Sequence, residues 1–332
     1  MSDTTTLRFA LLNDWQRGFP LVRAPFAALA QAVAADEAEV LDTYATLQRD
    51  GALGRLGGVW GAGAGGAALL CAFEVPAPRL EAVAALVSAH PGVNHNYERE
   101  HAVNLWFVIT GRGREAVHAE VDALEAASGL VALRMPMRRA YRIDLGFDLR
   151  RPLAEGGALQ RRGAPVQDSD APLAALVEDG LPLVRQPYDA WAQALGRPRD
   201  AVLATLERWL DEGTLRRFGA IVRHHEAGYA HNAMTVFDVP DDAVDAHGAA
   251  LAAQAGVTLA YRRERAPGWR YNLYCMVHGR DREAVRAAVA GATRAAGLQH
   301  HAQALLFSRR RFKQTGPRYF RAPATEDAHV AA

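Results

Sequence analysis

One short segment places four side chains that can transfer protons or bind anions within seven positions. It reads NHNYEREH and spans residues 94–101. Alternate residues of a β-strand point to the same face, so His95, Tyr97, Arg99 and, if the strand continues, His101 should project together. Packing does not explain this set, because each polar group would need a partner if buried. The pattern favours a surface that binds an anion and moves protons; the alternative is a solvated polar edge strand.

A second segment, YRRER, is rich in arginine. Tyr261, Arg263 and Arg265 alternate as Tyr97 and its neighbours do, and Arg262 adds a further guanidinium. Guanidinium groups bind carboxylates and phosphates through paired hydrogen bonds. The segment therefore favours a polyanionic ligand. The alternative is a salt-bridged surface in which Glu264 is one partner.

A third group consists of His224, His225 and His231 in the segment RHHEAGYAH, residues 223–231. Imidazoles titrate near neutral pH, so these side chains can move protons, contact the iron of a bound haem-like ligand or bind a metal. A closed zinc site is not expected, because no thiolate or second spaced histidine pair completes one.

The elements that must position these residues occur twice along the chain. GFPLVR at 18–23 recurs as GLPLVR at 180–185, and FEVP at 73–76 recurs as FDVP at 237–240. The copies differ where the histidines lie, since the stretch of the first copy that corresponds to 223–231 is glycine-rich (GAGAGG, 61–66). We therefore expect a duplication whose halves have diverged in role, and no second complete site in the first copy.

Each copy predicts a helix-turn-helix with a short wing, followed by strand, helix, two strands, helix and strand. This βαββαβ order is that of the ferredoxin-like fold, so the fold class is α+β. Helices cover one face of such an antiparallel sheet and leave the other face for a ligand or partner. We expect helix-turn-helix domains at 1–60 and 173–222, ferredoxin-like domains at 61–145 and 223–320, and a linker at 146–172.

The amino-acid composition and the absence of known motifs exclude several classes of protein. Thirty-eight Lys and Arg balance 37 Asp and Glu, so no global charge draws the chain to nucleic acid or an anionic membrane. The N-terminus lacks the basic and apolar regions of a secretory signal, and both cysteines lie in apolar segments. We expect a cytoplasmic protein without disulfides. Phosphate-binding, dinucleotide-binding, serine-hydrolase and zinc-protease motifs are absent from the sequence.

The segments VNHNYEREHAVNLWF and YRRERAPGWRYNLYCMVHG, each after a helix-turn-helix, resemble siroheme decarboxylases, which are relatives of the Lrp/AsnC regulators. The halves are similar to the D-type and L-type subunits fused into one chain, and the resemblance covers both copies. It implies removal of the C12 and C18 acetate carboxyl groups of siroheme. The products would be 12,18-didecarboxysiroheme and two CO2, in the biosynthesis of haem d1 during denitrification or in an alternative haem pathway. It implies no cofactor, since siroheme carries the iron.

The same resemblance suggests roles for the residues above and a pseudo-symmetric pairing of the halves, or a homo-oligomer. No metal is expected on the protein alone, although His225 or His231 is a candidate axial contact to the iron of siroheme. The expected catalytic residues are His95, His101, His225, Tyr97 and Tyr261, and the expected substrate-binding residues are Arg99, Arg262, Arg263, Arg265, His224 and His231.

Two other functions compete with this one. A regulator of the Lrp/AsnC kind would need a basic recognition helix, but the segments 36–50 and 197–212 are both net acidic. DNA binding is therefore not expected. A tetrapyrrole carrier or sensor would need the same arginines as the enzyme, and only product formation separates the two.

Overall fold

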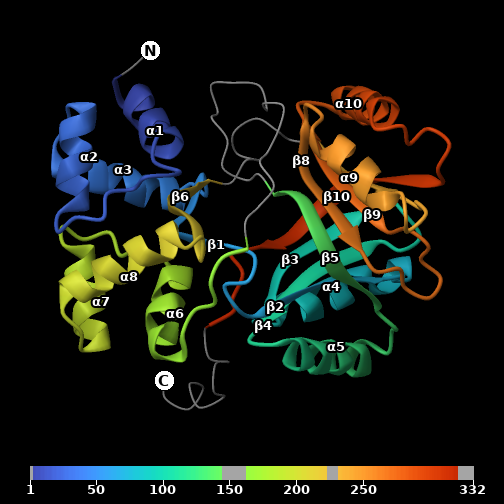
Figure 1. Cartoon of the computed structure of the whole chain (residues 1–332), viewed down its shortest axis with the longest axis horizontal. Coiled ribbons are helices and arrows are strands. Elements are labelled where there is room, and N and C mark those ends of the chain that lie inside the picture. The colour runs from blue at the N-terminus through green and yellow to red at the C-terminus, as the bar shows by residue number, and fades with distance from the viewer. Residues whose placement is uncertain (1–2, 144–161, 223–230, 321–332) are drawn as a thin grey trace. The chain divides into compact units, whose positions relative to one another are not determined.

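The computed structural model describes residues 3–143, 162–222 and 231–320 (Figure 1). These residues form two compact units. The first unit is drawn from residues 1–64 and 137–307, and the second from residues 65–136 and 308–332. Among the described helices, none is long and apolar enough to cross a membrane.

The first unit contains both helix-turn-helix segments, and they are joined by a two-stranded sheet. The antiparallel strands β1 and β6 align Leu56 with Ala220. A short 3-10 helix, η2 (Asp168–Asp170), precedes the second segment. The elements of the first segment are α1 (Asp3–Asn13), α2 (Pro25–Val33), α3 (Glu37–Arg49) and β1 (Leu53–Trp60), and those of the second are α6 (Ala171–Asp179), α7 (Pro187–Leu195), α8 (Arg199–Asp211) and β6 (Leu215–Val222).

The contacts between the two helix-turn-helix segments are reciprocal. The Phe19 amide donates to the Phe218 carbonyl at 3.4 Å, and the Leu181 amide donates to the Leu56 carbonyl at 2.7 Å. Two ion pairs also cross in opposite directions, from Arg23 to Asp189 and from Arg185 to Glu37. The duplicated sequences therefore pack as a pseudo-symmetric pair, as expected from the repeat.

The second unit contains the first ferredoxin-like sheet, in the strand order β3-β4-β2-β5. Helices α4 and α5 pack on one face, over a core that includes Phe73 and Phe107. The final strand β10 also contributes, because its residues 308–314 pair with β3. The bounds are β2 (Ala67–Phe73), the 3-10 helix η1 (Ala77–Arg79), α4 (Leu80–Ala89), β3 (Val93–Arg99), β4 (Leu105–Gly111), α5 (Arg114–Ser128) and β5 (Leu133–Ile143).

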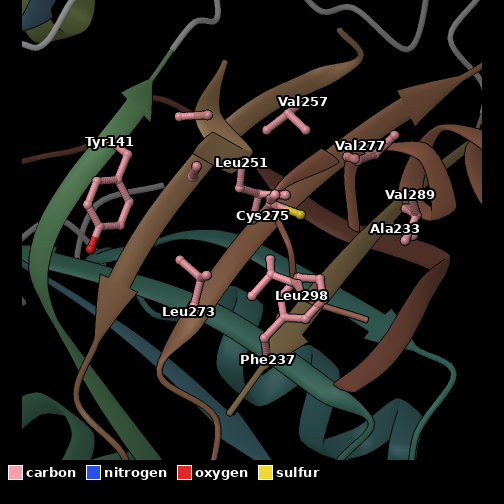
Figure 2. Packing of buried hydrophobic residues seen from close by; sticks show 14 of the residues in the cluster. Tyr141, Ala233, Phe237, Leu251, Val257, Leu273, Cys275, Val277, Val289 and Leu298 are labelled. Atoms are coloured by element: carbon pink, nitrogen blue, oxygen red, sulfur yellow. The ribbon is translucent and has the colours of Figure 1, made fainter. Parts of the chain in front are cut away.

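The second ferredoxin-like sheet lies in the first unit and has the equivalent order, β8-β9-β7-β10. Residues 137–143 of β5 pair with β8. Figure 2 shows its core, in which Phe237, Leu251, Leu273 and Cys275 pack together. The bounds are β7 (His231–Phe237), α9 (Val244–Ala252), β8 (Val257–Arg263), β9 (Leu273–Gly279), α10 (Arg282–Ala295) and β10 (Gln303–Gln314).

The predicted βαββαβ order is thus confirmed in both copies. In each copy, helices cover one sheet face, and the strands turn alternate side chains to the opposite face. We call the uncovered face of the first copy, on β3 and its neighbours, the first face; it belongs to the second unit. We call the uncovered face of the second copy, on β8 and its neighbours, the second face; it belongs to the first unit.

Candidate functional site

Strand β3 divides its polar residues cleanly between the two sides of the sheet. The Asn96 amide donates to the Ala84 carbonyl and to Ser88 Oγ of α4, both at 3.0 Å, so Asn96 lies on the helix-covered side. Alternation then places His95, Tyr97 and Arg99 together on the first face. This part of the sequence prediction is confirmed.

The three side chains of the first face are in sequential contact. The His95 and Tyr97 rings stack with centroids 6.2 Å apart, and the Arg99 guanidinium lies 5.6 Å from the Tyr97 centroid. Arg99 Nη1 donates to Ser308 Oγ at 3.1 Å. His95 Nδ1 lies 2.8 Å from Asn94 Oδ1, so the neutral ring that donates from Nδ1 presents an unprotonated Nε2.

Electrostatics on the first face favour the arrival of an anion. Burial, with a smaller contribution from Arg99, lowers the pKa of His95 to about 4. Burial also lowers the pKa of Arg99 to about 10, against the opposing effect of Tyr97. Burial raises the pKa of Tyr97, while Arg99 and Arg311 act to lower it. A bound carboxylate would offset the cost of the buried guanidinium and raise the pKa of the imidazole.

His101 does not belong to this face. Strand β3 ends at Arg99, and the His101 amide donates to the Arg99 carbonyl at 3.0 Å in the turn that follows. The ring is exposed, and its Nδ1 accepts from the Val103 amide. The condition for His101 to share the face is therefore not met, because the chain reverses toward β4 after Arg99; a catalytic role for His101 stays a prediction.

The second face repeats the tyrosine and arginine pair. The Arg263 guanidinium lies 5.1 Å from the Tyr261 centroid and 5.8 Å from that of Tyr274. Burial raises the pKa of Tyr261 to about 12, against the effects of Arg263 and of Arg216 from β6. The position that corresponds to His95 is Leu259, so the second face has the same clamp without the imidazole.

Arg262 and Arg265 lie away from Tyr261. Arg262 is 3.5 Å from both Asp241 and Asp245, and Arg265 forms 2.9 Å ion pairs with Asp238 and Asp241. The expectation that Arg265 shares the face of Tyr261 is wrong, because β8 ends at Arg263.

These two arginines border an open groove of about 630 Å³, lined throughout by charged side chains: Arg138, Arg139, Asp241, Asp245, Arg262, Arg263, Glu264 and Arg265. Acidic side chains already pair with several of its arginines, and none of its lining residues is apolar.

The remaining predicted histidines are placed only in part. His231 is the first residue of β7 and has the same alternation as Ala233, which packs in the helix-covered core. It therefore lies on the side opposite the second face. His224 and His225 lie outside the described residues, so their roles stay predictions.

Three residues near the faces were missed by sequence reasoning. Ser308 and Arg311 reach the first face from β10, and Arg216 influences Tyr261 from β6. The run of three arginines at 309–311 was the available signal for Arg311. This run points to the first face only if β10 is known to pair with β3, and that pairing joins distant parts of the chain.

Three arginines near and within α8 of the second helix-turn-helix pair with acidic side chains. Arg197 and Arg208 both pair with Asp170, at 2.9 and 2.8 Å. Arg199 pairs with Asp189 and Asp200. These pairs reduce the positive charge that a phosphate backbone would meet, in line with the acidic character of the segment.

Comparison with known proteins identifies the family. A model of the AsnC-like ligand binding domain matches residues 64–142 and 226–313, and a model of the siroheme decarboxylase NirDL-like HTH domain matches 9–53 and 170–216. The siroheme decarboxylase NirDL subunit of Paracoccus pantotrophus is 41% identical over 314 residues, covering 93% of this chain and 96% of that protein. This chain belongs to the siroheme decarboxylase family. The siroheme decarboxylase of Hydrogenobacter thermophilus is 33% identical, with 93% and 94% of the two chains covered.

A solved structure of this family agrees over nearly the whole chain. The crystal structure of the siroheme decarboxylase NirDL superposes with a TM-score of 0.69 at 28% identity, covering 96% of this chain and 95% of that one. That enzyme has also been crystallised in complex with an iron-uroporphyrin III analogue, with a TM-score of 0.67 to this chain. The family and the α+β fold class expected from the sequence are confirmed.

Proposed function

We propose that this protein is a siroheme decarboxylase that removes the C12 and C18 acetate carboxyl groups of siroheme. The products are 12,18-didecarboxysiroheme and two CO2, for haem d1 or an alternative haem pathway. The observation that carries the proposal is 41% identity to a siroheme decarboxylase subunit over 93% of the chain. The first face adds a chemical reason, because a buried guanidinium, a phenol and an imidazole adjoin there.

Each decarboxylation is a redox-neutral replacement of a carboxylate by a proton. The bond between the side-chain methylene and the carboxyl carbon breaks, CO2 leaves, and the electron pair stays on the methylene beside the pyrrole. One proton then converts the methylene to a methyl group. The reaction needs no oxidant or reductant, so we propose that the protein uses no cofactor beyond the iron of its substrate.

We assign the proton transfer to His95. In the free protein its lowered pKa keeps the imidazole neutral at pH 7. Siroheme carries eight carboxylates, and negative charge close to the ring raises the pKa of His95. Substrate binding therefore favours protonation of the His95 imidazole, which supplies the proton that the reaction consumes. A group that titrates near the working pH on binding is suited to this general-acid role.

Arg99 and Tyr97 complete the first face in this proposal. Arg99 binds a substrate carboxylate, for which its guanidinium is already held by Ser308 and the Tyr97 ring. Tyr97 stacks between the imidazole and the guanidinium and orients both. A rigid arrangement of this kind reduces the reorganisation needed during the reaction.

On the second face, we propose that Tyr261 and Arg263 bind carboxylates, whereas Leu259 cannot donate a proton. Arg262 and Arg265 are assigned to the ion pairs that fasten β8 to the α9 side of the sheet. His224 and His225 lie outside the described residues and are retained as candidates for proton transfer or iron contact, as the sequence predicts.

Siroheme is thus the proposed partner of the chain. We also propose a cytoplasmic location, in keeping with two buried free thiols, Cys71 and Cys275. The pairing of β1 with β6 joins the two helix-turn-helix segments within one chain and supports a fused pseudo-dimer.

The test is anaerobic incubation of the purified protein with siroheme, followed by mass analysis of the tetrapyrrole. Loss of two CO2 is expected, and a species that has lost one would show a stepwise reaction. A changed visible spectrum without any mass change would favour a carrier or sensor. Neither binding nor turnover would refute the proposal and return a regulator to consideration.

A further inference from the structure

Three consecutive arginines of β10 lie in different environments. Arg309 lies 3.6 Å from Glu98 and 3.7 Å from Glu100. Arg310 forms 2.6 Å ion pairs with Glu81 of α4 and with Glu98. The first two arginines of the run are therefore neutralised by carboxylates, and Arg310 points to the helix-covered side.

The third arginine is oriented toward the first face. Arg311 is the cross-strand partner of Tyr97, while the next residue, Phe312, packs against the helix-covered core. Its guanidinium donates to Gln314 Oε1 at 3.0 Å. Its charge reaches the Tyr97 phenol, whose pKa it acts to lower.

The second face has apolar residues at the equivalent positions. Each face is bordered by the extended final strand of the opposite copy, β10 for the first face and β5 for the second. On the first face the cross-strand pairs are Arg99 with Ser308, Tyr97 with Arg311 and His95 with Gln314. The equivalent pairs on the second face are, in the same order, Arg263 with Met137, Tyr261 with Ala140 and Leu259 with Ile143.

We propose that Arg311 is a further substrate-binding residue of the first face, and that it binds a carboxylate that the reaction leaves in place. This inference rests on the proposed function. An arginine on a reacting acetate would stabilise the carboxylate in the ground state and oppose the departure of its charge, so it would slow the reaction. An arginine on a retained propionate stabilises substrate and transition state equally, and so lowers KM and leaves kcat unchanged.

The experiment compares Arg311→Gln with Arg309→Gln, a matched loss of charge two residues away on an exposed side chain. Arg311→Gln should raise KM for siroheme about tenfold, since hydrogen bonds to charged groups contribute roughly 1.5–3 kcal/mol, and kcat should stay within twofold. Arg309→Gln should change neither. Arg311→Lys should recover part of the affinity, because it keeps the charge and loses the fork.

Spectroscopic titration gives a readout that does not depend on turnover. Arg311→Gln should weaken binding of siroheme and of 12,18-didecarboxysiroheme by the same factor, because the retained carboxylate is present in both. Equal affinity of wild type and Arg311→Gln would overturn the inference. So would a loss restricted to siroheme, or a fall in kcat with unchanged KM. Absence of turnover in the wild type would refute the proposed function instead.

Discussion

The half-buried imidazole of His95 should make the stability of the protein depend on pH. Its pKa in the folded chain is about 4, against 6.5 for an unperturbed histidine. Because the folded pKa is the lower one, the unfolded chain binds the proton more readily. The stabilisation that neutral His95 contributes is therefore fully present above about pH 7. It is lost progressively as the pH falls from 6.5 toward 4.

The size of this effect follows from the two pKa values. Between pH 7.5 and pH 5, linkage predicts a loss of about 2 kcal/mol from this one group. His95→Gln removes the titrating ring, so the variant should lose about 2 kcal/mol less than the wild type over the same interval. Urea unfolding at the two pH values measures both free energies of unfolding.

The control for this experiment is His300→Gln, which also removes one histidine from the unfolded chain but replaces an exposed residue outside both faces. If His95→Gln and the wild type show the same pH dependence, the imidazole is not held in its neutral form by burial and Arg99. The account of substrate-coupled protonation would then fail as well.

Three further predictions concern stability and DNA. Gly66 has φ +70°, and a Cβ there would lie 2.5 Å from the Tyr319 side chain, whereas Gly129 has φ +66° and open space around it. Gly66→Ala should therefore lower the free energy of urea unfolding by at least about 1 kcal/mol more than Gly129→Ala does. Equal losses in the two variants would contradict the packing at Gly66. Burial opposes ionisation of Asp238, but hydrogen bonds from Arg265 and Arg270 outweigh it and lower the carboxyl pKa. Asp238→Asn should therefore lose about 1 kcal/mol at pH 7, and this loss should shrink as pH falls below 3.8 through the lowered pKa of the wild-type carboxyl; a loss independent of pH would argue against the ion pairs. In gel shifts at low salt, no genomic fragment should bind, and a specific shift would revive the regulator.

Much of the fold was predictable because its signals are local. Strand and helix periodicity gave the βαββαβ order of each copy, and period-two alternation brought His95, Tyr97 and Arg99 to one face. The same reasoning extended β8 to Arg265. It failed there because the turn after Arg263 begins within polar sequence that continues the strand pattern.

The border of the first face was not predictable for a different reason. Ser308 and Arg311 reach β3 because β10 extends beyond its own sheet and pairs with a strand about 200 positions earlier. No local pattern specifies such a contact. The sequence did indicate that the copies differ in role, but it favoured a complete site in the second copy. In the structure it is the second face that has Leu259 and Ala140 where the first face has His95 and Arg311.

In the proposed mechanism the first face supplies the proton and the second face does not. The most direct test is a single-turnover reaction of siroheme with His95→Leu, which gives the first face the residue of the second, beside Leu259→Ala as the matched change on the second face. We predict that His95→Leu still binds siroheme but forms no decarboxylated product, and that Leu259→Ala decarboxylates at close to the wild-type rate. Wild-type turnover by His95→Leu would contradict the account.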